Sequence, residues 1–190
     1  MDISTLLESA LASGAADKLA TKLGVESTVA KKMIALGAPL LLSQLSKNAE
    51  TEEGASSLYN ALDKHTTARS DIDDDDTDGQ KIISHIFGGE KENTASKIAK
   101  EAGVSKEQAG GALASLAPLL LGALGEEKSK GGLSLENLAG VLGDTTKAVN
   151  SNSMLQSLAV SLLDKNNDGD YKDDLLRMGA NWIKKQFAKK

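Results

Sequence analysis

The residues best suited to chemistry form an acidic loop, residues 164–175, with the sequence DKNNDGDYKDDL. Asp164, Asn166 and Asp168 place oxygen-bearing side chains at alternate positions, and Gly169 allows the sharp turn that lets them converge on one point. Alternating oxygen ligands followed by a glycine are typical of the calcium loop of EF-hand proteins. The spacing therefore predicts a divalent-cation site, with calcium the first candidate and magnesium the second.

The end of this loop departs from the EF-hand pattern. Position twelve, which is normally a bidentate glutamate, is Leu175, and carboxylates stand one and two positions earlier. A shorter loop of modest affinity is therefore expected, in which the cation ligands are Asp164, Asn166, Asp168, Asp170, Asp173 and Asp174. The alternative is a plain polar loop between two helices. Repulsion among five closely spaced aspartates without a counter-ion favours the metal site.

Two earlier stretches of the chain follow one plan. When residues 18–45 are placed over residues 97–124, 12 of 28 positions are identical, and both prolines of the chain, Pro39 and Pro118, coincide.

The chain is 40% apolar but only 3% aromatic, so its core must be built from Leu, Ala, Ile and Val. This composition favours helices, because the β-branched and aromatic runs typical of strands are missing. We expect an all-α, duplicated multi-helical bundle whose two proline-bearing helices pack together, each proline either kinking its helix or starting a new one.

The expected organisation has four parts. The first helical repeat is residues 1–70, an acidic linker is 71–79, the second repeat is 80–150, and 151–190 form a C-terminal helix-loop-helix that carries the acidic loop. The linker is too polar to bury enough surface to order itself. Its end also resembles the opening of a calcium loop, but no carboxylate follows Asp78 before Glu90 to close one.

Charge and composition exclude several functions. The chain has no cysteine, which excludes disulfides, thiolate catalysis and cysteine-ligated metal sites. Its net charge of −5 gives no attraction for nucleic-acid phosphates or anionic lipid. The uncharged run Ala109–Gly125 would span about 25 Å as a helix, short of the roughly 30 Å of a bilayer core, so we interpret it as a buried helix rather than a membrane span. Because no basic region precedes an apolar run near Met1, a cytoplasmic protein is expected.

Two further patterns point to structure rather than chemistry. Residues 98–113 resemble the helix-turn-helix of bacterial repressors, but the positions that would read bases, Ser105–Gln108, contain no arginine, so a structural turn is favoured over DNA binding. His85, in the segment KIISHIF, is expected to be partly buried, and neither it nor His65 stands in a catalytic motif. We therefore expect a non-enzymatic structural or interaction module, in which a second copy or another protein covers apolar surface that one repeat leaves open.

Three segments occur in an order that resembles a known family: GQKIISHIFGG at residues 79–89, ASLAPLLLGALG at 114–125 and LLDKNNDGDYKDDLL at 162–176. Together they are similar to the YidB-like bacterial proteins of the family catalogued as domain of unknown function 937. The resemblance covers most of residues 1–176 and implies an all-helical fold and a bacterial protein that is not secreted. It implies no reaction and no catalytic residue, so the calcium assignment rests on spacing alone.

Overall fold

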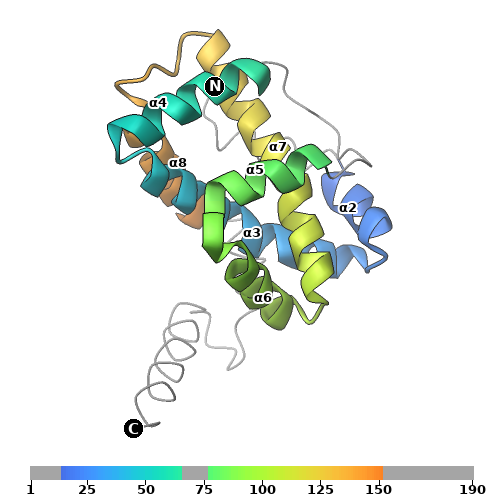
Figure 1. Ribbon diagram of the computed structural model, residues 1–190. Helices are drawn as coiled ribbons and strands as arrows, with labels where there is room; N and C mark the ends of the chain where they lie inside the picture. The colour runs from blue at the N-terminus through green and yellow to red at the C-terminus, as the bar shows by residue number, and fades with distance from the viewer. Residues whose placement is uncertain (1–13, 66–76, 152–190) are drawn as a thin grey trace, which may run out of the picture.

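The computed structural model describes residues 14–65 and 77–151, and the regular elements in these ranges are helices (Figure 1). In chain order they are α2 (Ala16–Leu23), α3 (Ser27–Asn48), α4 (Glu52–Ala61), the 3-10 helix η2 (Leu62–His65), α5 (Thr77–Phe87), the 3-10 helix η3 (Gly88–Glu90), α6 (Lys91–Ala102), α7 (Lys106–Ser129) and α8 (Leu138–Ser151). The predicted all-α class is therefore confirmed for the described part of the chain.

Helix α7 is the centre of the fold. It runs through the middle of the molecule, and α3, α5, α6 and η2 all pack against it (Figure 1). From Ala109 to Gly125 every residue except Gly110 is buried, as an uncharged helix that is apolar on all sides requires. The helix is long and apolar enough to cross a membrane, but 89% of its most apolar window is buried inside the protein. This burial is what a core helix has, and it agrees with the interpretation of the apolar run.

Both prolines lie inside continuous helices. Helix α3 passes through Pro39 and α7 passes through Pro118 without a new helix starting at either residue. The two helices touch at Gly37, where an added Cβ atom would lie 3.2 Å from a methyl group of Leu116 and 3.4 Å from one of Leu113. The absence of a side chain at this glycine thus lets the two proline-bearing helices approach closely.

The shorter helix ahead of each proline-bearing helix ends in the same way. Helix α2 ends at Gly24 and α6 ends at Gly103, and both glycines have left-handed backbone angles, with φ of 63° and 73°. Glycine adopts this conformation without steric cost, which is why it closes helices. The side chain of Ser105 then caps α7 by accepting a hydrogen bond from the backbone N–H of Gln108.

Helix α5 begins within the predicted acidic linker. It starts at Thr77, so residues 77–79 belong to a helix, while residues 71–76 lie outside the described ranges. Gly79 lies at a close helix crossing, because a Cβ atom there would lie only 2.0 Å from the carbonyl oxygen of Ala114 in α7. Gly79 therefore serves the contact between α5 and α7, and it is not the turn of a calcium loop.

Candidate functional site

The predicted cation site lies outside the part of the chain that the structure describes. This applies to all six expected ligands: Asp164, Asn166, Asp168, Asp170, Asp173 and Asp174. Within residues 14–65 and 77–151, no three His, Asp or Glu side chains come close enough together to hold a metal ion. The calcium loop therefore stays a prediction from its spacing.

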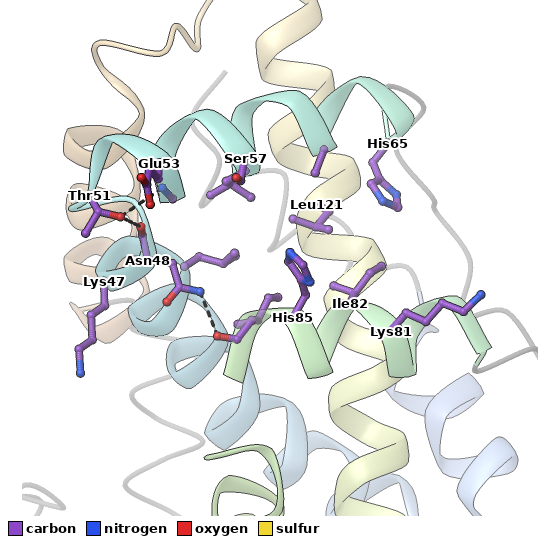
Figure 2. Close-up of a pocket in the computed structure, with 15 residues that line it drawn as sticks. Lys47, Asn48, Thr51, Glu53, Ser57, His65, Lys81, Ile82, His85 and Leu121 are labelled. Atoms are coloured by element: carbon purple, nitrogen blue, oxygen red, sulfur yellow. Dashed lines mark hydrogen bonds between the residues drawn. The ribbon is translucent and has the colours of Figure 1, made fainter. Parts of the chain in front are cut away.

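The described residues form a different candidate site, a groove of about 680 Å³ between two walls (Figure 2). One wall is α4 with η2, the other is α5, and the C-terminal turn of α3 closes one end. Its apolar lining comes from Leu45, Leu58, Ala61, Ile82, Ile86 and Leu121. Its polar lining comes from Lys47, Asn48, Thr51, Glu53, Ser57, His65, Lys81 and His85. Since Leu121 belongs to the core helix α7, the groove opens directly over the hydrophobic core.

Polar contacts hold the closed end of the groove. The Asn48 side-chain amide donates a hydrogen bond of 2.9 Å to the carbonyl oxygen of Ile86, which joins the end of α3 to α5 (Figure 2). The Gln44 side-chain amide donates a hydrogen bond of 3.0 Å to the side-chain oxygen of Asn48. At the start of α4, the Thr51 hydroxyl accepts a hydrogen bond of 3.1 Å from the backbone N–H of Gly54. The end of α3 is thus joined to the last turn of α5, and α4 is capped where it begins.

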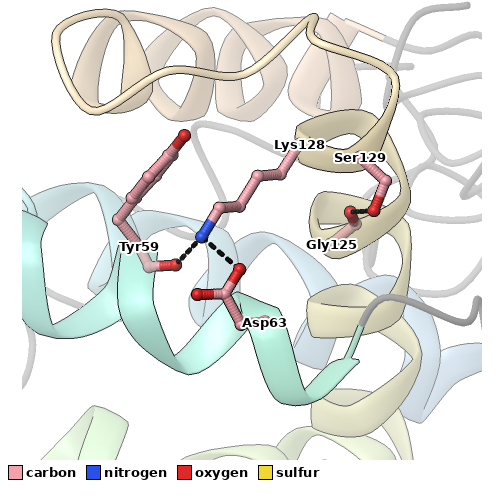
Figure 3. A network of polar contacts seen from close by, with 5 residues as sticks. All are labelled: Tyr59, Asp63, Gly125, Lys128 and Ser129. Atoms are coloured by element: carbon pink, nitrogen blue, oxygen red, sulfur yellow. Dashed lines mark hydrogen bonds and ion pairs between the residues drawn. The ribbon is translucent and has the colours of Figure 1, made fainter.

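The α4–η2 wall is tied to the core helix by a lysine (Figure 3). The Lys128 ammonium donates to the carbonyl oxygen of Tyr59 at 2.7 Å, lies 2.6 Å from an Asp63 carboxylate oxygen, and stands 3.7 Å from the centre of the Tyr59 ring. The Lys128 side chain is only 13% exposed but the Asp63 side chain is 63% exposed, so water still screens the ion pair in part. Gly125 adds a close approach, because a Cβ atom there would lie 2.1 Å from the His65 carbonyl oxygen.

The groove brings together the two histidines of the chain. His65 lies on η2 and His85 on α5, and both rings project into the space between the two walls (Figure 2). His85 is exposed, so the expectation that it is partly buried is wrong. The buried face of α5 is instead built from Ile82, Ile83, Ile86 and Phe87. That spacing of apolar residues is the sequence signal that places His85 off the core face.

The groove also carries residue types that enzymes use in catalysis. Ser57, Glu53 and two imidazoles are the types used in acyl transfer, but that chemistry needs a hydrogen bond from the serine to a histidine base. No hydrogen bond joins Ser57 to His85 among the described residues. The groove offers instead an apolar floor with charged and hydrogen-bonding groups along its rim.

The segment that resembles a helix-turn-helix uses its polar groups inside the fold. Gln108 donates its side-chain amide to the carbonyl oxygen of Leu23 at 3.0 Å and accepts from the backbone N–H of Ser105 at 3.0 Å. Lys106 forms an ion pair with Glu92, and the hydrogen bond and charge of this lysine lower the pKa of the Glu92 carboxyl below its usual value. Because α7 is buried from Ala109 to Gly125 apart from Gly110, only its first turn and the residues after Gly125 reach the surface.

Comparison with known proteins places the chain in a family without an assigned activity. No curated protein and no solved structure matches it significantly. A family model described as a bacterial protein of unknown function (DUF937) does match, over residues 5–127, a range that holds both walls of the groove and most of α7. Since this match spans more than half of the chain, the protein belongs to that bacterial family of unknown function, as the order of its sequence motifs predicts.

Proposed function

We propose that the protein is a non-enzymatic helical binding module and that the groove between α4 and α5 is its binding surface. The observation that carries this proposal is the lining of the groove, where an apolar floor meets polar side chains supplied by separate elements. Small-ligand sites in proteins have this composition, and their volumes are roughly 300–1,000 Å³. Asn48 ties α5 to the end of α3, and Lys128 ties α4 to the core helix, so contacts within the protein fix each wall, which favours a preformed site.

The proposal includes a duplicated fold. The pairs α2–α3 and α6–α7 share a left-handed glycine after the shorter helix, at Gly24 and Gly103, and an aligned proline within the longer one. The elements that build the groove walls, α4, η2 and α5, lie between these two pairs in the chain. The repeat would then build the core, and the connection between its copies would build the binding surface.

Filling the groove tests this function. Ser57 is exposed and lines the groove, so Ser57→Trp should obstruct it without disturbing the core. The probe is the neutral dye Nile red, whose fluorescence rises in apolar sites. We expect saturable binding by the wild type and its loss in Ser57→Trp, whereas Lys97→Trp, at an exposed position of α6, should bind like the wild type. Equal dye binding by all three proteins would refute a binding role for the groove.

A second function, calcium binding by the C-terminal acidic loop, is favoured by the D-x-N-x-D-G spacing that starts at Asp164. Thermal melts in EDTA, calcium and magnesium test it. A cation at a hundred times its dissociation constant adds about 2.7 kcal/mol, which raises the melting temperature by several degrees. The double variant Asp164→Ala, Asp168→Ala should lose this rise. If it melts in millimolar calcium as the wild type does, the loop is not a calcium site.

The alternatives of a nucleic-acid binder and of a self-associating scaffold have less support. A recognition helix needs an exposed face, and the face that α7 would offer is occupied by its neighbours beyond the first turn. The core helix is covered within one chain, which removes the reason for expecting a second copy to cover it. A mobility shift at low salt would revive the first alternative, and a dimer seen by light scattering would revive the second.

A further inference from the structure

We propose that the N-terminal segment, residues 1–13, docks as a helix on an apolar strip of α3, in the place that α5 takes on the core helix α7. The strip consists of Ala35, Leu36, Pro39 and Leu40. This inference rests on the duplicated fold included in the proposed function, because it assigns the element that the first copy would otherwise lack. It does not depend on what the groove binds.

The strip forms one side of α3 and is not fully covered. Its four residues are spaced i, i+1, i+4 and i+5, so they lie together along the helix. Ala35, Leu36 and Pro39 are partly exposed, and Leu40 is 39% exposed. Helices α2, α6, α7 and α8 all pack on α3 and still leave this strip partly open. A contiguous apolar strip, unlike a single exposed leucine, favours a further packing partner.

The matching strip of the core helix is covered. In the alignment of residues 18–45 with residues 97–124, the strip falls on Ala114, Ser115, Pro118 and Leu119. All four of these α7 residues are buried, and Leu119 is only 7% exposed where Leu40 is 39% exposed. Helix α5 crosses α7 here, since a Cβ atom at Gly79 would lie 2.0 Å from the Ala114 carbonyl oxygen (Figure 1). Within the described ranges, α3 has no counterpart of α5 on its strip.

The N-terminal segment has the apolar spacing of α5. The buried side chains of α5 stand at i, i+1, i+4 and i+5, and they are Ile82, Ile83, Ile86 and Phe87. The same spacing occurs in the segment with Leu6, Leu7, Ala10 and Leu11. As an α-helix, the segment would present one apolar side of the kind that α5 buries, with Thr5 and Ser9 on the opposite side.

The segment also holds the place of α5 in the order of the chain. Gly88 follows α5 with a φ of 53°, and α6 begins three residues later. Gly14 follows the segment with a φ of 88°, and α2 begins two residues later. Because α2 packs on α3 as α6 packs on α7, the segment joins the fold beside the helix that it would cover. No long connection is needed for the docking.

Charge favours this segment as the occupant. Lys31 and Lys32 continue the strip by about one helical turn toward the start of α3. The segment carries Asp2 and Glu8 and no basic side chain. Attraction to the two lysines therefore favours it over the lysine-rich C-terminal end of the chain, which would be repelled.

Thiol labelling tests the docking, because the chain has no cysteine of its own. Leu40→Cys places one thiol in the strip, and its rate of reaction with iodoacetamide is measured in the full chain. Adding Leu7→Asp and Leu11→Asp should raise this rate about tenfold or more, since burial of each leucine favours docking roughly tenfold or more.

The matched control is the pair Thr5→Asp and Ser9→Asp, which adds the same charges to the polar side of the segment and should leave the rate unchanged. A thiol placed by Ser57→Cys, which is exposed in the groove, should react at the same rate in all backgrounds. Far-UV circular dichroism checks that every variant stays helical.

A cross-link identifies the covering segment without the acidic variants. When Leu7→Cys and Leu40→Cys stand in one chain, a short bismaleimide should join the two thiols within a monomer. Leu7→Cys with Ser57→Cys should stay unlinked, because Ser57 lines the groove and Leu40 does not.

Three results would overturn the inference. If positions 7 and 40 do not cross-link and the acidic variant labels at the unchanged rate, the segment does not cover the strip. If the cross-link joins two chains, a second copy covers it. If position 7 links to position 57, the segment lies in the groove. In the first case the proposed binding function still stands, provided that Nile red binding is lost in Ser57→Trp.

Discussion

Replacing Gly79 by alanine tests most directly how α5 lies on the core helix. A Cβ atom at this position would lie 2.0 Å from the carbonyl oxygen of Ala114 and 2.7 Å from its carbonyl carbon. Heavy atoms of residues that are not its chain neighbours essentially never lie within 3.0 Å of a real Cβ atom. Because the obstacle is backbone rather than a flexible side chain, the first turn of α5 must move away from α7.

The expected cost follows from two opposing effects. Overpacking of this kind costs about 1–3 kcal/mol, and moving α5 also disturbs Ile83, which is fully buried. Alanine in place of glycine within a helix returns up to about 1 kcal/mol through its better helix propensity. We therefore expect Gly79→Ala to lower the free energy of unfolding by up to about 2 kcal/mol and the melting temperature by up to about 8 °C.

Gly110→Ala provides a matched control with the opposite sign. Gly110 lies in the core helix, and an added Cβ atom would meet nothing within 4 Å. Only the propensity effect then remains, so this variant should be more stable than the wild type by about 0.5–1 kcal/mol. The same chemical change is thus expected to destabilise at one glycine and to stabilise at the other.

Urea denaturation followed by circular dichroism measures the change in the free energy of unfolding for both variants. The comparison requires that this free energy depend on urea concentration with the same slope in each protein. If Gly79→Ala stabilises as Gly110→Ala does, α5 does not cross α7 at this glycine and the groove wall is misplaced. The measurement is repeated in EDTA and in calcium. Equal destabilisation of Gly79→Ala in both buffers supports the helix crossing. Destabilisation seen only in calcium would instead indicate that Gly79 forms the turn of a calcium loop.

Three further substitutions probe contacts around the core helix. Ser105→Ala removes the N-cap of α7 and should cost about 1 kcal/mol in urea denaturation, and no change would mean that the capping box contributes nothing. Lys128→Met removes a hydrogen bond and an ion pair at a mostly buried side chain and should cost about 1–3 kcal/mol, against about 0–1 kcal/mol for Lys130→Met at a more exposed pair. Because Lys106 lowers the folded-state pKa of Glu92 below 4.5, the Glu92 carboxylate contributes stability that is present above that pH and is lost as the pH falls below it. Thermal melts should therefore show the wild type losing its advantage over Glu92→Gln in acid, and a constant difference would refute this linkage.

The features of the fold that the sequence predicts are those set by local chemistry. The burial of α7 follows from an uncharged run that must be covered on every side. The helix ends at Gly24 and Gly103 follow from the ease with which glycine takes a positive φ. The cap at Ser105 follows from a hydroxyl that can accept from the backbone three residues later. Each of these depends on residues within a few positions of one another.

The candidate groove could not be predicted in this way, because its residues meet only through tertiary packing. Asn48 reaches the carbonyl of Ile86, and Lys128 reaches that of Tyr59, across long separations in the chain. The crossing of α5 over α7 at Gly79 is likewise a contact that no local pattern contains. The position of His85 was predictable, since the neighbouring isoleucines and Phe87 define a core face that excludes it.

Some residues of the groove can be replaced to test ligand binding without changing the stability of the fold. Lys81 and His85 are exposed, and they make no hydrogen bond or ion pair within the described ranges, so stability gives no reason for these two residue types at the rim. Replacing either should change the free energy of unfolding by no more than about 0.5 kcal/mol. A loss of ligand affinity in a variant of unchanged stability would then have to come from the lost contact with the ligand. The opposite holds at Leu121, which lines the groove and also belongs to the core, so a weaker affinity after its substitution would not tell binding from folding.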